Sequence, residues 1–183
     1  MVIRMVGAAA IATVMSLGST NIRAEEGHGL GSIRGEQGIE LKAFDHAMAG
    51  SIRDFVIWGS VNEETGTSEL IMRRDGQDVK SIFKKANNVF GGIVEHLSPE
   101  GKRQTKIAFT RLDRQKNEYS FEVNGAVVKG LVTSEDFANN HFIKPTYVLQ
   151  LADGKSVTFK FDGQACYNYS LHILTMMIAS IVH

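Results

Sequence analysis

The sequence contains a single cysteine, Cys166, among 183 residues. One thiol cannot form an internal disulfide, so a disulfide-stapled scaffold of the kind common in small exported proteins is excluded. We expect Cys166 to be a small buried apolar side chain, with an intermolecular disulfide or a catalytic thiol as the alternatives. The folded chain must therefore gain its stability from packing.

The sequence also lacks an excess of either charge, with 20 basic and 20 acidic residues. A general nucleic-acid-binding surface needs clustered basic charge to displace counterions from phosphates. Here the densest basic spots are isolated pairs, such as Arg73-Arg74 and Lys84-Lys85. We therefore expect no nucleic-acid partner.

No hydrophobic run is long enough to cross a membrane as a helix, which takes roughly 20 residues. The two most apolar stretches are residues 5–17 and 171–182. The second has no charged residue, and its apolar positions follow a helical spacing. It predicts a buried C-terminal helix that closes one side of the fold.

The first apolar stretch has the three-part pattern of a secretory signal peptide. Arg4 gives a positive start, residues 5–17 form the apolar centre, and Ala24 is the best cleavage position. No cysteine lies directly after the apolar centre, so a lipoprotein anchor is not indicated. We predict a signal peptide over residues 1–24 and a periplasmic or secreted protein of 159 residues.

Catalytic and metal-binding motifs are missing as well. The sequence has no His-x-x-x-His pair, no Cys/His cluster with zinc spacing and no Gly-x-Ser-x-Gly element. We expect no metal and no cofactor, and a non-catalytic role is favoured over an enzymatic one. The alternative is an enzyme whose site assembles from dispersed residues such as Glu95, His96 and His141.

Two segments of different character precede the part of the sequence that has strand patterns. Residues 25–38 are rich in glycine and predict a flexible arm. Leu41, Phe44 and Met48 have helical spacing before Gly50, which predicts an amphipathic helix over residues 39–50. Residues 39–183 are then expected to form one β-rich domain.

Alternating apolar and polar residues between turn signals predict the strands. Asp75-Gly76, Asn124-Gly125 and Asp153-Gly154 are the strongest hairpin turns. Ser134 is placed to cap a short helix that interrupts the strands. The predicted strands cover residues 54–61, 69–73, 79–84, 88–97, 104–112, 118–123, 127–132, 147–151 and 156–161.

These patterns predict a mainly β (α+β) fold with a helix at each end. Because the strands follow one another at short spacing, we expect an antiparallel meander that forms a barrel or a sandwich of about seven to nine strands. No spacing typical of parallel βαβ units is present.

Aromatic residues are the candidate ligand-binding group. The residues concerned are Trp58, Tyr119, Phe121, Phe159 and Phe161. Four of them, all except Trp58, fall on the inward faces of two predicted strands, where they line a cavity or fill a core.

The sequence therefore favours an exported, non-catalytic binding or interaction protein that holds a small apolar ligand in a β-barrel or docks a protein partner. The alternatives are a periplasmic enzyme and a small outer-membrane β-barrel. Lys106, Lys129 and Lys160 at outward strand positions oppose the second alternative.

Overall fold

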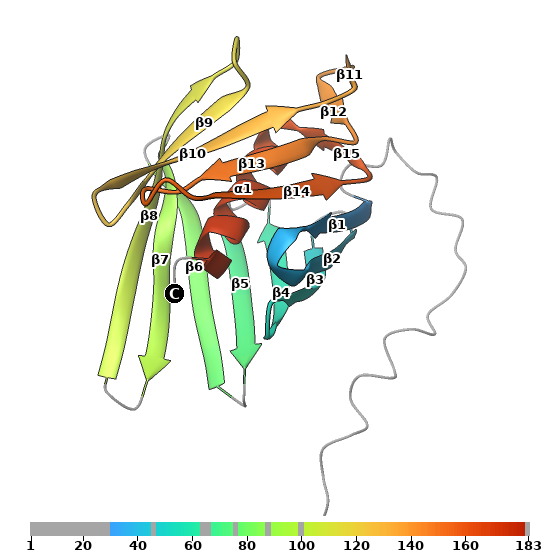
Figure 1. The fold of residues 1–183 in the computed structure, drawn as a ribbon. Helices are drawn as coiled ribbons and strands as arrows, with labels where there is room; N and C mark the ends of the chain where they lie inside the picture. The colour runs from blue at the N-terminus through green and yellow to red at the C-terminus, as the bar shows by residue number, and fades with distance from the viewer. Residues whose placement is uncertain are drawn as a thin grey trace, which may run out of the picture.

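The computed structural model of the protein describes residues 30–44, 47–62, 67–74, 77–86, 89–98 and 101–181 (Figure 1). These residues form fifteen β-strands, a one-turn 3-10 helix and one α-helix. The predicted mainly β, antiparallel class with an apolar C-terminal helix is confirmed. The predicted signal peptide lies outside the described residues.

Two sheets contain all of these strands. The large sheet consists of β1 (Gly31–Gly35), β2 (Ile39–Phe44), β3 (Ala47–Ile52), β4 (Phe55–Asn62), β5 (Thr67–Arg74), β6 (Gln77–Ala86), β7 (Val89–Ser98), β8 (Gly101–Asp113), β9 (Glu118–Val123), β10 (Ala126–Thr133), β13 (Thr146–Gln150) and β14 (Ser156–Phe161). The small sheet consists of β11 (Asp136–Ala138), β12 (His141–Ile143) and β15 (Gln164–Cys166), and the helix α1 (Tyr167–Ile181) follows β15 directly.

The large sheet is antiparallel, and its hydrogen bonding closes on itself. From β2 to β10 each strand pairs with the next along the chain, and β10 then pairs with β13 and β13 with β14. Strand β1 pairs with both β14 and β2, so the order of strands returns to its beginning. All twelve strands are paired on both sides, more strands than the seven to nine expected.

The inward faces of the strands follow the alternation seen in the sequence. On β14, Val157, Phe159 and Phe161 are buried, whereas Lys160 between the last two is exposed. The turn between β9 and β10 is the predicted hairpin, because Asn124 and Gly125 have φ values of 49° and 85°. Two positive φ values in succession are the requirement of a type I′ turn.

Residues 39–44 and 47–52 form two strands, so the helix predicted over residues 39–50 is wrong. Strands β2 and β3 pair along their whole length. Ile39, Leu41 and Ala43 are buried at every second position, whereas Phe44 is exposed. The apolar residues thus fit a two-residue period as well as a helical one, and pairing with β1 and β4 selects the strand.

Two further expectations differ from the structure. The predicted flexible arm over residues 25–38 includes β1, which is hydrogen-bonded on both sides and buries Ile33. The predicted short helix after Ser134 is instead the hairpin β11–β12. Asn139 and Asn140 form its turn with φ values of 51° and 64°. Asparagine tolerates this conformation because its short side chain can hydrogen-bond locally.

Helix α1 lies inside the curve of the large sheet (Figure 1). Ten of its 15 residues are buried, and residues 173–180 are buried without a break. A helix that is apolar on all sides must be enclosed by protein. Within the described residues, no helix is long and apolar enough to span a membrane.

Two strand glycines allow α1 to approach the sheet. A Cβ atom at Gly130 would lie 2.7 Å from Leu174, and one at Gly59 would lie 2.8 Å from the sulfur of Met176. Both distances are too short for real carbon contacts. Leu174 is itself fully buried and packed, so it has less room to move than the flexible end of a methionine.

We predict that Gly130→Ala lowers the free energy of unfolding by about 1–3 kcal/mol, because the added methyl group overpacks the contact with Leu174. Chemical denaturation measures this change. In a Leu174→Ala background the same substitution should cost less or stabilise the protein, since the space is then available. Equal and additive effects in both backgrounds would show that the helix does not touch β10 at this point.

Candidate functional site

The predicted aromatic residues do not form one site. Tyr119, Phe121, Phe159 and Phe161 point inward and are each at most 1% exposed, in the same buried cluster as α1. Trp58 lies on the outward face of β4 and is 48% exposed. The structure therefore brings four of the five together as part of a packed core, and separates Trp58 from them.

Hydrogen bonds join the helix to the surrounding strands inside this core. The hydroxyl of Tyr119 donates to the carbonyl oxygen of Tyr167 at 3.0 Å, and the hydroxyls of Tyr147 and Ser170 are 3.1 Å apart. Burial raises the pKa of both Tyr119 and Tyr147. Both phenols consequently stay protonated and remain available as hydrogen-bond donors.

His172 makes a third link between the helix and the sheet. Its Nδ1 lies 2.6 Å from the hydroxyl of Ser68, which is buried on β5. Desolvation by burial lowers the pKa of His172 to about 4. The imidazole is therefore neutral at pH 7, and protonating it costs free energy in the folded state.

The depressed pKa of His172 predicts loss of stability in acid. The unfolded chain takes up this proton near the ordinary pKa of 6.5, and the folded chain only near 4. Between those two values the free energy of unfolding should fall by about 1.4 kcal/mol for each pH unit lost. Above pH 6.5 His172 is neutral in both the folded and the unfolded chain, so it causes no loss of stability there.

Denaturant unfolding of wild type and His172→Gln between pH 7 and pH 4 checks this prediction. The carboxylates of Asp54 and Asp153, whose pKa values are lowered mainly by hydrogen bonds from Arg74 and Lys155, also weaken the fold in acid. They do so equally in both proteins, so the difference between the two curves isolates His172. Parallel pH dependences would contradict the assignment.

The titratable residues considered for catalysis are dispersed. Cys166 accepts a hydrogen bond from the backbone N–H of Tyr169 at 3.4 Å, and His141 lies within 2.6 Å of the carbonyl oxygen of Asn139. The side chains of Glu95 and His96 lie outside the described part of the structure. Among the described residues, no three His, Cys, Asp or Glu side chains gather as a metal site.

An open groove occurs on the outer surface, where the small sheet meets the large one. It has a volume of about 540 Å³ and is lined from β1, β10, β13, β14 and the segments on either side of the β11–β12 hairpin. Three cationic side chains line it, from Arg34, Lys144 and Lys160. Two carboxylates, Glu135 and Asp162, also contribute, so the formal charge of the groove is +1. We call this feature the outer groove.

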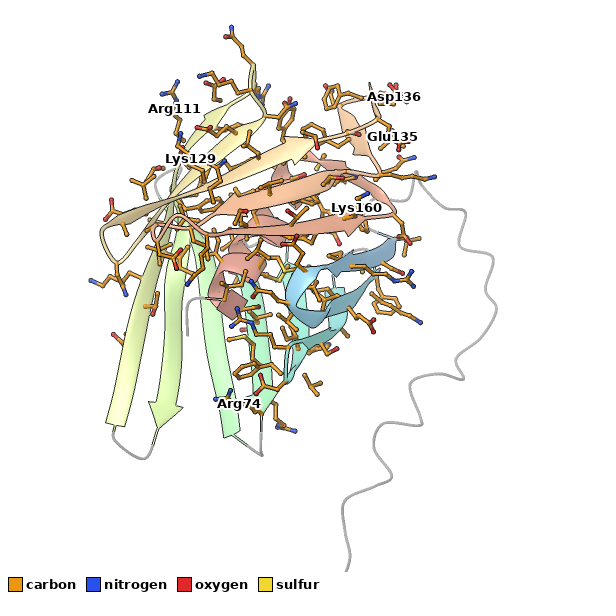
Figure 2. All side chains as sticks on the ribbon, viewed as in Figure 1. Arg74, Arg111, Lys129, Glu135, Asp136 and Lys160 are labelled. Atoms are coloured by element: carbon orange, nitrogen blue, oxygen red, sulfur yellow. The ribbon has the colours of Figure 1, made fainter. Side chains whose placement is uncertain are left out.

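Strand alternation determines which side chains reach the outer groove. Lys160 points outward because Phe159 and Phe161 on either side of it are buried, and Arg34 points outward next to the buried Ile33. Arg34 and Lys160 are direct cross-strand partners in the β1–β14 pair. Figure 2 shows Lys160 and Glu135 at the end of the molecule where the two sheets meet.

The third cation is carried on a strained backbone. Lys144 has a φ of 46°, a left-handed conformation that is unfavourable for lysine and more so before proline, here Pro145. Its N–H donates to the carbonyl oxygen of Gly163 at 2.9 Å, which holds the segment against the β14–β15 connection. The fold thus fixes Lys144 at the rim of the groove at a cost in backbone energy.

Asp162 is hydrogen-bonded to the backbone of β1. Its Oδ1 accepts the backbone N–H of Ser32, so it links the end of β14 to β1. A Cβ atom at Gly31 would lie 2.4 Å from this carboxylate, which explains the glycine beside it. A second pocket of about 480 Å³ shares Lys144 and Asp162 with the outer groove and continues toward His141.

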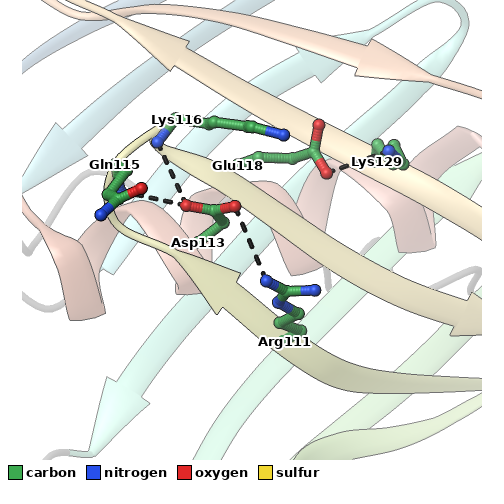
Figure 3. Close-up of polar contacts among 6 residues, drawn as sticks. All are labelled: Arg111, Asp113, Gln115, Lys116, Glu118 and Lys129. Carbon is green, nitrogen blue, oxygen red and sulfur yellow. Dashed lines mark hydrogen bonds and ion pairs between the residues drawn. The ribbon is translucent and has the colours of Figure 1, made fainter.

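Two cations on β8 and β10 are held in ion pairs. Figure 3 shows Lys129 in an ion pair with Glu118 at 3.0 Å and Arg111 with Asp113 at 3.7 Å. Asp113 also accepts backbone N–H bonds in the β8–β9 turn. Within the described residues, Arg34, Lys144 and Lys160 make no such pair. The three groove cations therefore differ from Lys129 and Arg111, which are held by carboxylates.

Large apolar side chains are exposed on another part of the large sheet. Phe44, Val56 and Trp58 on the outward faces of β2 and β4 are 50%, 65% and 48% exposed. Trp58 lies opposite Ile71 of β5 in the cross-strand register. We call Phe44, Val56, Trp58 and Ile71 the outer apolar patch.

Comparison with protein-family models, with curated proteins and with solved structures finds no match. The sequence alone did not reveal the outer groove, since its charged residues come from four separate segments of the chain. The one available signal was the outward position of Lys160 between two inward aromatic residues.

Proposed function

We propose that this chain is an exported, non-catalytic binding protein that holds a small molecule on the outer face of its sheet. The observation that carries the proposal is the contrast between inside and outside. The inward aromatic residues are packed in one cluster with α1, whereas the outer groove is open and has five charged side chains in its lining. Its volume lies in the range usual for small-molecule sites.

Export is supported by the sequence of residues 1–24, with Arg4, the apolar stretch and Ala24 in signal-peptide order. A binding role is supported by the rigidity of the scaffold. Arg34 and Lys160 lie on paired strands whose register is fixed by buried residues such as Ile33 and Phe161, whereas Lys144 lies in a connection. A site on such elements is held more accurately than one on loops.

The test is native mass spectrometry of the protein isolated from the exported fraction of the cells that produce it. We expect an intact mass lacking residues 1–24 and a non-covalent adduct of a small molecule. Thr146→Trp, which fills the outer groove, should abolish the adduct. Thr110→Trp is the control: Thr110 lies on the outward face of β8, and this variant should retain the adduct. An adduct unaffected by Thr146→Trp, or no adduct in the wild type, would oppose the proposal.

The second candidate function is docking of a protein partner on the outer apolar patch, and the partner we propose is a second copy of this chain. Large exposed apolar groups grouped on one face are typical of interaction surfaces. A two-fold axis uses the same surface on both copies, so two copies related by an axis at Ile71 would cover Trp58 and Ile71 of each with those of the other.

Sedimentation velocity over a range of concentrations tests this second candidate. We expect the wild type to form dimers and Trp58→Ser to be shifted toward monomer. Phe137→Ser removes an aromatic residue of similar exposure, 46%, outside the patch and should sediment as the wild type does. A wild type that is monomeric throughout would rule out self-association through this patch.

A further inference from the structure

Two cations of the outer groove face each other across a strand pair, which is unfavourable for the stability of the fold. Arg34 and Lys160 are direct neighbours across the β1–β14 pair. Like charges in this position repel and destabilise a sheet. In the part of the chain that the structure describes, neither makes an ion pair, and Lys144 makes none either. Glu40 of β2 is the other direct cross-strand neighbour of Arg34 and offsets part of this repulsion, although the two form no ion pair. Lys160 has no carboxylate directly opposite it, since its other cross-strand neighbour is Thr146.

Backbone strain occurs at the same groove. Lys144 adopts a left-handed conformation before Pro145 and is held there by its hydrogen bond to Gly163. Unfavourable local features that are fixed by the surrounding structure are concentrated at functional sites. Two independent features, repulsion between Arg34 and Lys160 and strain at Lys144, thus meet in one groove.

The two carboxylates of the groove form no ion pair with these cations and leave it with a formal charge of +1. Asp162 is hydrogen-bonded to the backbone of Ser32. Glu135 comes from the segment before β11 and faces the groove from the small-sheet side. The hydroxyl-bearing residues Thr133 and Thr146 lie on the large-sheet side and can add neutral hydrogen bonds.

We propose that the outer groove binds the oxyanion group, a carboxylate or a phosphate, of a small polar molecule through Arg34, Lys144 and Lys160. A guanidinium offers paired donors to such a group, and the two ammonium groups add charge-assisted hydrogen bonds. A bound anion removes the repulsion between Arg34 and Lys160. Glu135 then receives a hydroxyl or amine of the same molecule. This proposal rests on the proposed function and names the chemistry of its ligand.

Three probes that share one carbon skeleton test the proposal, namely glycerol 3-phosphate, glycerate and glycerol. Each is titrated into the isotope-labelled full chain at constant ionic strength while amide NMR shifts are recorded. We expect saturable shifts around Arg34, Lys144 and Lys160 with at least one of the two anions and none with glycerol. Comparing the two anions distinguishes a phosphate site from a carboxylate site.

Variants link the binding to the named cations. Lys160→Gln should weaken binding of the effective anion by about tenfold or more. Lys106→Gln is the matched control, because Lys106 is exposed on β8, four strands from β14 in the sheet order and roughly 19 Å away. Its binding should equal that of the wild type.

The melting temperature of the ligand-free protein distinguishes a binding role of Lys160 from a structural one. Because Lys160 faces Arg34, Lys160→Gln should leave the melting temperature unchanged or raise it. A lowered melting temperature would show that Lys160 supports the fold, and would overturn the proposal. So would the absence of saturable shifts with both anions, or anion affinity unchanged by Lys160→Gln. Saturable binding of glycerol alone would overturn the anion site but leave the proposed binding function in place.

Discussion

Helix α1 can be stable only if the large sheet encloses it, and the rest of the structure follows from that enclosure. Its buried residues, among them Ile173, Leu174 and Met177, leave no apolar face for water. Each such side chain contributes about 1.5–3 kcal/mol when it is fully buried. A flat sheet could cover only one side of the helix. The continuous pairing from β2 around to β1 supplies partners on the other sides.

The same enclosure explains the polar contacts within the core. A hydroxyl or imidazole that is removed from water must find a partner inside the protein. Ser170 and His172 on the helix meet Tyr147 and Ser68 on opposite parts of the sheet. These contacts have directional requirements that apolar packing lacks, so they define how far the helix is inserted and how it is rotated.

Local patterns in the sequence predicted strands β4 to β10, β13 and β14, but not β11, β12 or β15. The clearest pattern is in β9, where Tyr119, Phe121 and Val123 alternate with polar residues at a strict period of two. The same reasoning failed where pairing with residues distant in the sequence determines the secondary structure. Leu41 and Met48 fit a helix and a strand equally well, and their partners in β1 and β4 settle the outcome. The glycines of β1 suggested a flexible arm. They are instead required by close packing, because a Cβ atom at Gly31 or Gly35 would meet Asp162 or Phe159.

The outer groove depends on these long-range contacts even more strongly, since no segment carries enough of it to be recognised alone. One of its walls is fixed to the helix. Strand β12 pairs with β15, and β15 continues directly into α1 at Tyr167. The rings of Phe142 and Tyr167 are 5.0 Å apart, and the guanidinium of Arg114 lies 5.1 Å from the Tyr167 ring. Lys144 follows β12 by one residue, so its place at the groove is fixed through the small sheet by the start of α1. The start of α1 and Lys144 are thus linked through β15 and β12, so the packing of the interior contributes to the shape of the outer surface.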